Sequence, residues 1–458
     1  MHLPNYCNYT YFYNIHMALI KLRRGFDLNL KGKITQDNVA EELGSNTYAV
    51  VPDDFYGIIP RMEKKEGDTV AAGEPLYHDK NDEKIKVTSP VAGKVKEVVR
   101  GNRRKIMAIV IEPDNSGNVK TFDTKENPKA LLLESGLWAM IRQRPYDIVP
   151  STDVRPRDIF ITAFDSAPLA PSLSLVMGEN IKYLKKGVEV LSTMTDGKVY
   201  LGCPKDESLD DTGAEINTFV GPHPAGNAGV QAANIKPVNK GEVIWTLDVV
   251  TAARIGRLLE TGMVDYSTVV ALTGSGVENP CYVKATMGCT IKSLLDNRIV
   301  NDDKAKRIIS GNVLTGVKED MEGYLHAPYR HLTVINEINK KDEFMGWASL
   351  SPKKYSIYRV FTSWLLGRHK EVDLDAKLNG GERAIVMSGE YDKMLPMDIY
   401  AEFLIKAIIA FDIDKMEQLG IYEVAPEDFA LAEYADTSKL ELQRIVREGL
   451  DKMRAEMC

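Results

Sequence analysis

The sequence predicts a multidomain protein that combines α/β and α+β architecture, and three observations support this prediction. The chain of 458 residues is long enough for about three domains. Residues 56–113 read as short strands separated by turns, whereas residues 122–260 alternate between strand and helix patterns. Beyond residue 391 the apolar spacing is helical. These changes divide the chain into a non-native or disordered start at 1–16, a β-module at 17–115, an α/β domain at 116–262, a strand-rich module at 263–390 and a helical domain at 391–458.

Charge and cysteine content exclude several classes of protein. The net charge of -7 lacks the basic excess that a nucleic-acid binder normally shows. None of the five cysteines belongs to a Cys-x-x-Cys pair, so we predict neither a disulfide framework nor a zinc or iron–sulfur site, and a reducing cytoplasm fits best. The cysteines are Cys7, Cys203, Cys281, Cys289 and Cys458.

No stretch reads as a membrane span or as a signal peptide. The densest apolar run, residues 399–411, is shorter than the roughly 20 residues that cross a bilayer, and Glu402 and Lys406 interrupt it. The first sixteen residues are rich in tyrosine and asparagine and lack a cationic start with an apolar core. Because an orderly pattern begins only after them, we expect native translation to start at Met17.

The β-module has a recognisable pattern of turns. Residues 66–76 follow Glu-Gly-Asp-x-Val-x-x-Gly-x-x-Leu, and residues 89–95 follow Ser-Pro-Val-Ala-Gly-x-Val. This pattern resembles the barrel-sandwich fold of biotinyl and lipoyl carriers. Lys80 is the candidate for a modified lysine, but Asn-Asp follows it and its spacing to Ser89 is too long for that family. We therefore predict an unmodified structural barrel in preference to a swinging prosthetic arm.

The α/β domain contains a β-α-β unit. Residues 158–163 are a β-branched apolar run, residues 180–194 have helical spacing, and residues 199–202 give the next strand. Such a unit needs a right-handed crossover, which predicts a parallel, doubly wound, Rossmann-like sheet. Two loops then lie at the carboxyl edge of the strands, where open α/β sheets bind ligands. These loops are residues 165–171 and 221–229.

The second loop, residues 221–229, has the most unusual composition in the chain, Gly-Pro-His-Pro-Ala-Gly-Asn-Ala-Gly. Glycine permits positive φ and close backbone approach, while proline fixes φ and removes a donor, so this loop is expected to be stiff. A short buried strand at 218–220 precedes it. Two interpretations stay open: a ligand-binding edge, or a rigid joint between domains.

The motifs for nucleotide binding and for nucleophilic catalysis are missing. No Gly-x-Gly-x-x-Gly opens a helix after a strand, and no Gly-x-x-x-x-Gly-Lys-Ser/Thr occurs, so nucleotide binding is not supported. Asp153 and Asp165 read as turn caps in preference to catalytic carboxylates. His223 has no cysteine, serine or carboxylate partner nearby in the sequence, which leaves nucleophilic catalysis without an argument.

The strand-rich module reads as a compact β-grasp-like unit followed by further strands. The predicted elements are strands at 268–273, 282–286, 329–338 and 344–350, and a short helix at 290–297. His326, Arg330 and His331 lack metal-binding spacing with carboxylates, so we predict that they form a polar surface.

The C-terminal domain is predicted to contain helices at 397–410 and 426–435 and a final helix. Ser438 and Glu441 form a capping-box pattern at the start of the final helix. A stripe of apolar residues follows, which we expect to be core and not a membrane anchor. The stripe is Leu442, Ile445, Val446, Leu450 and Met453.

Several phrases carry a resemblance to a known family. Residues 160–171 read Phe-Ile-Thr-Ala-Phe-Asp-Ser-Ala-Pro-Leu-Ala-Pro, residues 195–200 read Thr-Asp-Gly-Lys-Val-Tyr, and residues 221–227 read Gly-Pro-His-Pro-Ala-Gly-Asn. Residues 380–384, Gly-Gly-Glu-Arg-Ala, strengthen the match. Together they resemble the A-subunit family of bacterial Na+-translocating NADH:quinone oxidoreductases, from about residue 20 to the C-terminus.

The resemblance implies a peripheral protein of a membrane complex, on the cytoplasmic face of the bacterial inner membrane, with no catalytic centre of its own. The complex would oxidise NADH, reduce ubiquinone or menaquinone to quinol, and export Na+. Five partner subunits would hold the flavins and iron centres. This chain would bind no cofactor and would contribute to quinone binding or to the architecture of the complex.

A second resemblance leaves an alternative open. The domain order is similar to that of the flavin-binding, NADH-oxidising subunits of complex I and of a ferredoxin-linked pump. Those subunits carry a glycine-rich flavin loop and four cysteines near the C-terminal helices. Here residues 134–140 contain one glycine and residues 434–437 contain no cysteine, so both redox sites look lost. The alternative is a chain that itself carries a flavin or another prosthetic group.

The quinone implied by the resemblance points to the two loops at the carboxyl edge. Donors would come from polar side chains of these loops, and Phe164, Leu169 and Phe219 would form apolar walls. Alternatively, the headgroup sits in a membrane partner and the loops only dock. No catalytic residue and no metal ligand is predicted. The candidate quinone-facing or docking residues are Asp165, Pro168, Leu169, Gly221, His223, Gly226 and Asn227.

Overall fold

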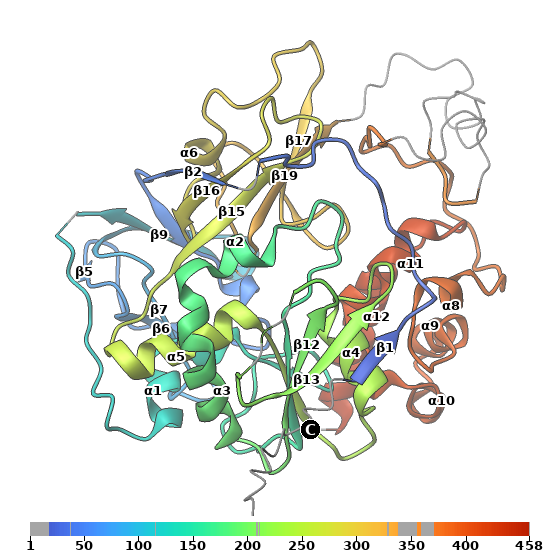
Figure 1. Cartoon of the computed structure of the whole chain (residues 1–458), viewed down its shortest axis with the longest axis horizontal. Coiled ribbons are helices and arrows are strands. Elements are labelled where there is room, and N and C mark those ends of the chain that lie inside the picture. The colour runs from blue at the N-terminus through green and yellow to red at the C-terminus, as the bar shows by residue number, and fades with distance from the viewer. Residues whose placement is uncertain are drawn as a thin grey trace, which may run out of the picture.

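The structure is a computed structural model (Figure 1), and it describes residues 18–36, 38–114, 116–207, 209, 211–327, 329–337, 355–358 and 371–457. The expectations for residues 1–16, for a start at Met17, for Cys7 and Cys458, and for a strand at 344–350 lie outside the described residues. Within the described part, no helix is long and apolar enough to cross a membrane.

The N-terminal β-module consists of two antiparallel sheets, as the run of short strands predicts. The residues that face inward, such as Leu76, Val95 and Ile109, are fully buried. Lys80 is exposed and follows β6 directly, at the turn before β7. One sheet has the order β3 (Tyr48–Val50), β9 (Ile106–Pro113), β8 (Gly93–Arg100) and β5 (Thr69–Val70); the other has the order β4 (Pro60–Met62), β6 (Pro75–Asp79) and β7 (Lys86–Thr88).

The α/β part is built on a six-stranded sheet whose strands are parallel except at one edge. The predicted strands at 158–163 and 199–202 form β11 and β12, and their predicted parallel pairing is confirmed. The order is β1 (Ala18–Lys21), β13 (Glu215–Val220), β12 (Val199–Pro204), β11 (Asp158–Thr162), β14 (Ile244–Asp248) and β10 (Arg142–Arg144). β1 joins this sheet although its residues fall within the range 17–115 that the sequence assigns to the β-module.

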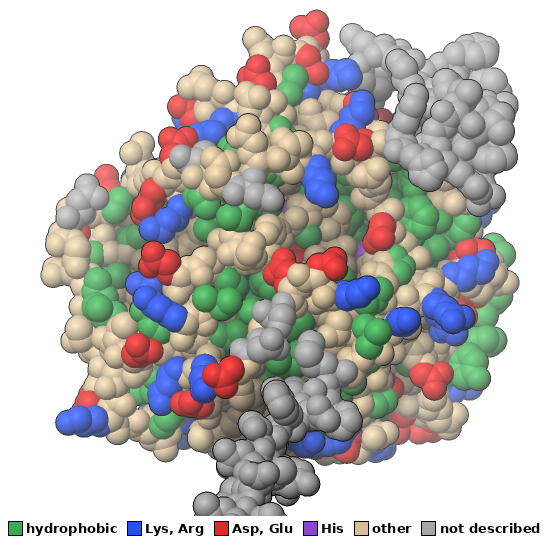
Figure 2. Space-filling model, in the orientation of Figure 1, with side chains coloured by type: hydrophobic (Ala, Val, Ile, Leu, Met, Phe, Trp, Pro, Cys, Tyr) green, Lys and Arg blue, Asp and Glu red, His purple; other side chains and the backbone are tan. Residues whose placement is uncertain are grey.

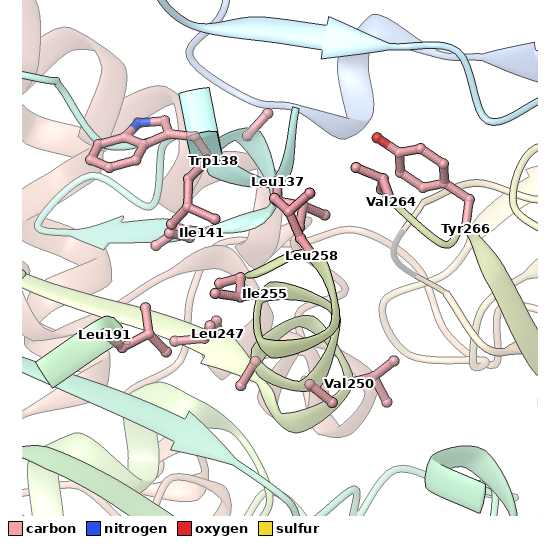
Figure 3. Packing of buried hydrophobic residues seen from close by; sticks show 14 of the residues in the cluster. Leu137, Trp138, Ile141, Leu191, Leu247, Val250, Ile255, Leu258, Val264 and Tyr266 are labelled. Atoms are coloured by element: carbon pink, nitrogen blue, oxygen red, sulfur yellow. The ribbon is translucent and has the colours of Figure 1, made fainter. Parts of the chain in front are cut away.

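Both faces of this sheet are buried, because adjacent residues of a strand point to opposite faces. Ile159 and Ile161 belong to one hydrophobic cluster, whereas Phe160 belongs to another. On the first face, Ile255 and Leu258 of α5 lie against Leu137 (Figure 3). The helices of this part are α1 (Pro128–Ser135), α2 (Leu173–Met177), α3 (Leu184–Ser192), α4 (Ala228–Ile235) and α5 (Val249–Thr261).

A second six-stranded sheet is mixed, and its core is a separate hydrophobic cluster. The predicted strands at 268–273 and 282–286 form an antiparallel pair, β15 and β16, and the predicted helix at 290–297 is α6 (Ile291–Leu295). The order is β18 (Val317–Glu319), β17 (Lys306–Ser310), β19 (His331–Asn336), β15 (Ser267–Thr273), β16 (Cys281–Thr286) and β2 (Val39–Glu42).

The C-terminal helices share one core with the second face of the parallel sheet, so they cover the side opposite α3 and α5 (Figure 1). Val446, Leu450 and Met453 are fully buried there, as the apolar stripe predicts. The helices are α8 (Glu390–Met394), α9 (Ala401–Ala410), α10 (Ile413–Gln418), α11 (Ala430–Ala435) and α12 (Leu442–Met457).

The predicted capping box at Ser438 is wrong. The final helix begins at Leu442, and Lys439 has a φ of 58°, which is incompatible with a right-handed helix at that residue. The hydroxyl of Ser438 donates instead to the carbonyl of Ala384, 3.1 Å away. The side chain is therefore used in a long-range contact and does not cap the helix.

Candidate functional site

The glycine–proline loop, residues 221–229, runs from β13 into α4 at the carboxyl edge of the parallel sheet. A hydroxyl of the neighbouring loop at 165–171 ties the two loops together. The N–H of Gly226 donates to Ser166 Oγ at 2.8 Å, and His223 Nδ1 lies 3.1 Å from the same Oγ. Thr162 adds a hydrogen bond from its hydroxyl to the carbonyl of Gly226 at 3.0 Å. The structure therefore brings together the two loops that the sequence predicts at this edge.

The glycines of the loop are needed for close packing and not for unusual backbone angles. None of Gly221, Gly226 and Gly229 has a positive φ. Of the two reasons for glycine that we expected from the sequence, positive φ therefore does not apply here and close backbone approach does. A Cβ on Gly226 would lie 2.3 Å from the carbonyl oxygen of Phe164 and 2.6 Å from the N of Ser166. A Cβ on Gly221 would lie 2.6 Å from the carbonyl oxygen of Leu22. Neighbouring backbone thus occupies the space of a side chain.

The loop also binds the segment that leads from β1. The N–H of His223 donates to Asp27 Oδ1 at 2.8 Å, and the carbonyl of His223 accepts from the N–H of Phe26, also at 2.8 Å. On the other side, Asn227 Nδ2 reaches the carbonyl of Glu427 at 3.4 Å and Asp428 Oδ1 at 3.5 Å. The loop is therefore a junction of the N-terminal segment, the parallel sheet and the C-terminal helices.

A buried ion pair lies directly behind this junction. The guanidinium of Arg144 is 1% exposed, and its Nη1 donates to Asp428 Oδ2 at 2.6 Å and to the carbonyl of Glu423 at 2.7 Å. A Cβ on Gly229 would lie 2.2 Å from Nη1. Burial by itself would lower the pKa of Arg144. The carboxylates of Asp428 and Glu427 outweigh this effect and hold the pKa above its usual range. Nothing in the sequence pattern signals this pair, because 284 residues separate its members.

His223 is buried and neutral. Burial lowers the pKa of this imidazole, although Asp165 and Asp27 oppose the change. Its Nε2 finds no hydrogen-bond partner among the described residues. No serine lies near His223 in the sequence, but the fold brings one close, because Ser166 Oγ lies 3.1 Å from Nδ1. Since no described carboxylate orients the other nitrogen and Ser166 already accepts from Gly226, this pair lacks the arrangement that activates a nucleophile.

The remaining candidate residues of the first loop have local roles. Asp165 is exposed, and its Oδ1 accepts from the N–H of Ala167 at 2.9 Å, which is the turn cap that we predict from the sequence. Pro168 is buried, and Leu169 is half-buried with a φ of 60°.

A cavity lies away from this junction, where the β-module, the start of the α/β part and the second sheet meet. The space within it that a water molecule can occupy is about 30 Å³, so neighbouring side chains must move before a larger ligand fits. Most of the lining is apolar, with Asp54, Thr88 and Tyr266 as polar exceptions. The other lining residues are Ala49, Val50, Val51, Phe55, Val87, Pro90, Gly136, Met140, Met287, Gly288 and Ala327.

Two hydroxyl groups lie on one side of this cavity. Tyr266 Oη donates to the carbonyl of Ser135 at 3.1 Å, and Thr88 Oγ1 donates to the same carbonyl at 3.0 Å. Burial raises the pKa of Tyr266 to about 12, so its phenol is neutral. Tyr266 lies beside Val264, which follows the end of α5 (Figure 3).

On another side, Asp54 belongs to a buried chain of charges. His326 Nδ1 lies 2.6 Å from Asp54 Oδ1, and His326 Nε2 lies 2.8 Å from Glu319 Oε1. Burial by itself would lower the pKa of His326, but the hydrogen bonds and charges of the two carboxylates outweigh it and raise this pKa to about 10. His326 is therefore an imidazolium that links the β-module to the second sheet.

The predicted polar surface at His326, Arg330 and His331 is wrong. His326 and His331 are buried, and the guanidinium of Arg330 forms an ion pair with Asp248 at the end of β14. The partners come from other parts of the chain, such as Asp54, which lies 272 residues before His326. Sequence reasoning missed the cavity for the same reason, because its lining comes from segments that only the fold brings together.

Models for the domains of one family match most of the chain. "NqrA N-terminal barrel-sandwich hybrid domain" matches residues 20–114, "NqrA second alpha/beta domain" matches 124–264, and "NQRA C-terminal domain" matches 269–320. The first match confirms the predicted barrel-sandwich fold. Among solved structures, an NAD+-reducing NiFe hydrogenase in the H2-reduced state is 10% identical with a TM-score of 0.34 over 46% of this chain and 47% of that chain, which is too low to show a common fold.

Several relatives that match over almost their full length bear the name of the A-subunit of the Na+-translocating NADH-quinone reductase. The protein of Vibrio anguillarum is 34% identical over 453 residues, which cover 96% of this chain and 100% of that protein. The proteins of Rhodopirellula baltica and of Neisseria meningitidis serogroup B are 32% and 31% identical, over 96% of this chain and 99% and 100% of theirs. At this identity and coverage, the chain belongs to the A-subunit family of the Na+-translocating NADH-quinone reductase, and is thereby part of a translocase.

Proposed function

We propose that this chain contributes a quinone-binding cavity to the Na+-translocating NADH-quinone reductase and carries no flavin or iron centre itself. In this proposal, five other subunits hold the redox cofactors, the complex oxidises NADH, reduces ubiquinone or menaquinone and exports Na+, and the chain lies at the cytoplasmic face of the inner membrane. The names of its relatives support the role in the complex. The scattered cysteines and the single glycine in residues 134–140 support the lack of a cofactor.

The observation that carries quinone binding is the cavity at the meeting point of three parts of the chain. Small-molecule sites are concave and mostly apolar, and a few polar groups set the orientation of the ligand. Phe55, Met140 and Met287 offer apolar and polarisable surface to a flat ring. The hydroxyls of Thr88 and Tyr266 are within the same lining, and one of them would have to leave the carbonyl of Ser135 to donate to a quinone oxygen.

For the glycine–proline loop we propose the role of a rigid joint. Its backbone groups and Asn227 are already hydrogen-bonded to Asp27, Ser166 and the segment around Asp428. Among the buried side-chain atoms of the loop, only Nε2 of His223 has no partner within the described residues, which is too little to hold a quinone. Of the two interpretations that the sequence leaves open, the contacts favour the joint.

We also propose that the domain boundaries follow the sequence-based divisions at residues 115, 262 and 390. In this proposal the parallel sheet is Rossmann-like, the second sheet is β-grasp-like, and the last part is a helical domain. Parallel pairing of β11 with β12 and antiparallel pairing of β15 with β16 support these assignments.

The experiment is labelling of the complex by a photoreactive quinone. Val51 is half-buried in the cavity lining, so Val51→Trp should fill the cavity and reduce labelling of this chain about tenfold. Val154→Trp is the matched control, because Val154 is exposed and lies outside the lining. The double variant His223→Ala and Asn227→Ala should be labelled like the wild type.

Three results would contradict the proposal. Normal labelling of Val51→Trp in an assembled complex would place the quinone elsewhere. Loss of labelling only in the double variant of His223 and Asn227 would place the quinone site at the carboxyl edge of the parallel sheet. A flavin or iron–sulfur absorption spectrum of the purified chain, or a prosthetic group on Lys80 found by intact mass, would instead support the alternative of a cofactor-carrying electron-input protein.

A further inference from the structure

The most exposed apolar side chains of the described residues gather in one part of the chain. Among the large apolar residues, the five with the highest exposure are Tyr400 at 67%, Leu378 and Ile409 at 57%, Phe403 at 56% and Val386 at 55%. All five lie between residues 378 and 409. Single exposed apolar residues are ordinary on a protein surface, but a concentrated group marks a surface that contacts something else.

Helix α9 presents this surface. Ala401, Leu404, Ile405 and Ile408 are buried in the core that the C-terminal helices share with the parallel sheet. The outward positions carry Phe403, Lys406 and Ile409, and Tyr400 lies directly before the helix with its ring centroid 6.4 Å from that of Phe403. A helix that is apolar on all sides is normally covered on all sides.

The segment before α8 extends the surface at one end. The carboxylate of Glu402 is buried and accepts from the N–H groups of Ser388 at 3.2 Å and Glu390 at 2.9 Å. These bonds hold Val386 and Met387, both exposed, beside the start of α9. Hydrophobic side chains are visible at the outer edge of the molecule over this group of helices (Figure 2). We call this the α9 surface: Val386, Met387, Tyr400, Phe403, Lys406 and Ile409.

Helix α12 shows what an ordinary surface helix of the same core looks like. Its buried face carries Val446, Leu450 and Met453, while its outer face carries Arg444 and Glu448 in an ion pair. Because both helices pack on one core, the difference between their outer faces is not a requirement of the fold. It reflects what each face meets.

Charge identifies the kind of partner. Lys406 is exposed within the α9 surface and has no ion pair among the described residues. An anionic membrane surface attracts clusters of several Lys or Arg, whereas this surface has one cation and the chain has a net charge of -7. A single cation in an apolar face is complementary to a protein surface that carries one carboxylate in an apolar setting.

We propose that the α9 surface docks onto another protein of the reductase complex, through an apolar patch of that protein with one carboxylate opposite Lys406. Because the chain belongs to a family of A-subunits, other subunits of the complex must exist, and one of them is the proposed partner of the α9 surface. The α9 surface and the quinone cavity share no residue, so each proposal can fail without the other.

The first test is recovery of the other subunits with the tagged chain from detergent-solubilised membranes. The double variant Phe403→Ser and Ile409→Ser should recover about tenfold less of them. The control Ile59→Ser and Ile181→Ser removes side chains of similar exposure, 51% and 49%, elsewhere and should recover them normally. The melting temperature of the isolated double variant should match the wild type, because the residues are exposed. Normal recovery by a folded double variant would overturn the proposal.

The second test examines the occupant and the charge. A photoreactive phenylalanine at position 403 in the whole complex should form a cross-link to another subunit of that complex. A cross-link only to lipid or to a second copy of this chain would overturn the proposal. Lys406→Glu should reduce recovery of the other subunits, whereas Lys452→Glu on α12, also exposed, should not. Equal recovery by these two variants would overturn the predicted carboxylate.

Discussion

Two buried histidines mark two regions of this protein, the junction at the glycine–proline loop and the cavity between the β-module and the second sheet. His223 at the junction is neutral, because burial lowers its pKa and its ring contacts a hydroxyl. His326 beside the cavity is charged, because carboxylates contact both of its nitrogens. The same residue type at similar burial thus carries a different charge, according to the groups that the fold places around it.

The difference shows how each region is held together. At the junction, neighbouring backbone fills the space of a side chain at Gly226, and the N–H of Gly226 donates to the hydroxyl of Ser166. Around the cavity, the lining is mostly apolar, a chain of charges fixes one side of it, and a space of about 30 Å³ remains. Dense packing is typical of a joint, whereas an apolar void with a fixed polar side is typical of a binding site.

The largest expected effect is at His326. Replacement by asparagine removes the imidazolium between Asp54 and Glu319 and leaves two carboxylates close together, one of them buried, so we expect a loss of about 4 kcal/mol in the free energy of unfolding. The control is His78→Asn, since the contact of His78 with Glu63 is more exposed and should be worth under about 1 kcal/mol. Denaturant unfolding measures both. Equal losses would show that the charge chain does not stabilise the fold.

A somewhat smaller effect is expected at the junction. Gly226→Ala places a methyl group 2.3 Å from the carbonyl oxygen of Phe164, and backbone cannot move aside as a flexible side chain can. We expect a loss of about 3 kcal/mol. Gly44→Ala is the matched control, because nothing lies within 4 Å of its Cβ position, and it should leave stability unchanged or slightly increased. A neutral Gly226→Ala would argue against the rigid joint.

The smallest expected effect, and the one that compares the two histidines directly, is the change of stability over a single pH unit. The pKa of His326 is raised to about 10, so its contribution is complete below about pH 6.5 and is lost as the pH rises towards 10. The pKa of His223 is lowered, so its contribution is complete above about pH 6.5 and is lost as the pH falls below that value. The slope of each should not exceed about 1.4 kcal/mol per pH unit.

Variants assign the two sides of this pH profile. His326→Gln should flatten the alkaline side only, and His223→Gln should flatten the acid side only. Unfolding curves measured from pH 5 to pH 10 check both expectations. If His326→Gln left the alkaline side unchanged, the imidazolium between Asp54 and Glu319 would be disproved.

Local patterns in the sequence predicted several parts of the fold. The turn pattern around residues 66–76 and 89–95 predicted the barrel-sandwich module, and the β-α-β spacing predicted the parallel pairing of β11 and β12. The composition of residues 221–229 predicted a stiff loop at the carboxyl edge. These features depend on residues close together in the chain, where periodicity and turn chemistry act. The phrases at 160–171, 195–200 and 221–227, strengthened by residues 380–384, also indicated the family.

The tertiary structure decided what those elements do. The partners of His223 and His326, the ion pair of Arg144 with Asp428, and the lining of the cavity all join residues that lie far apart in the chain. A side chain's charge state depends on its solvation and on its nearest charges, which no local pattern encodes. For that reason the sequence by itself left the glycine–proline loop as either a site or a joint, and only the contacts around it favour the joint.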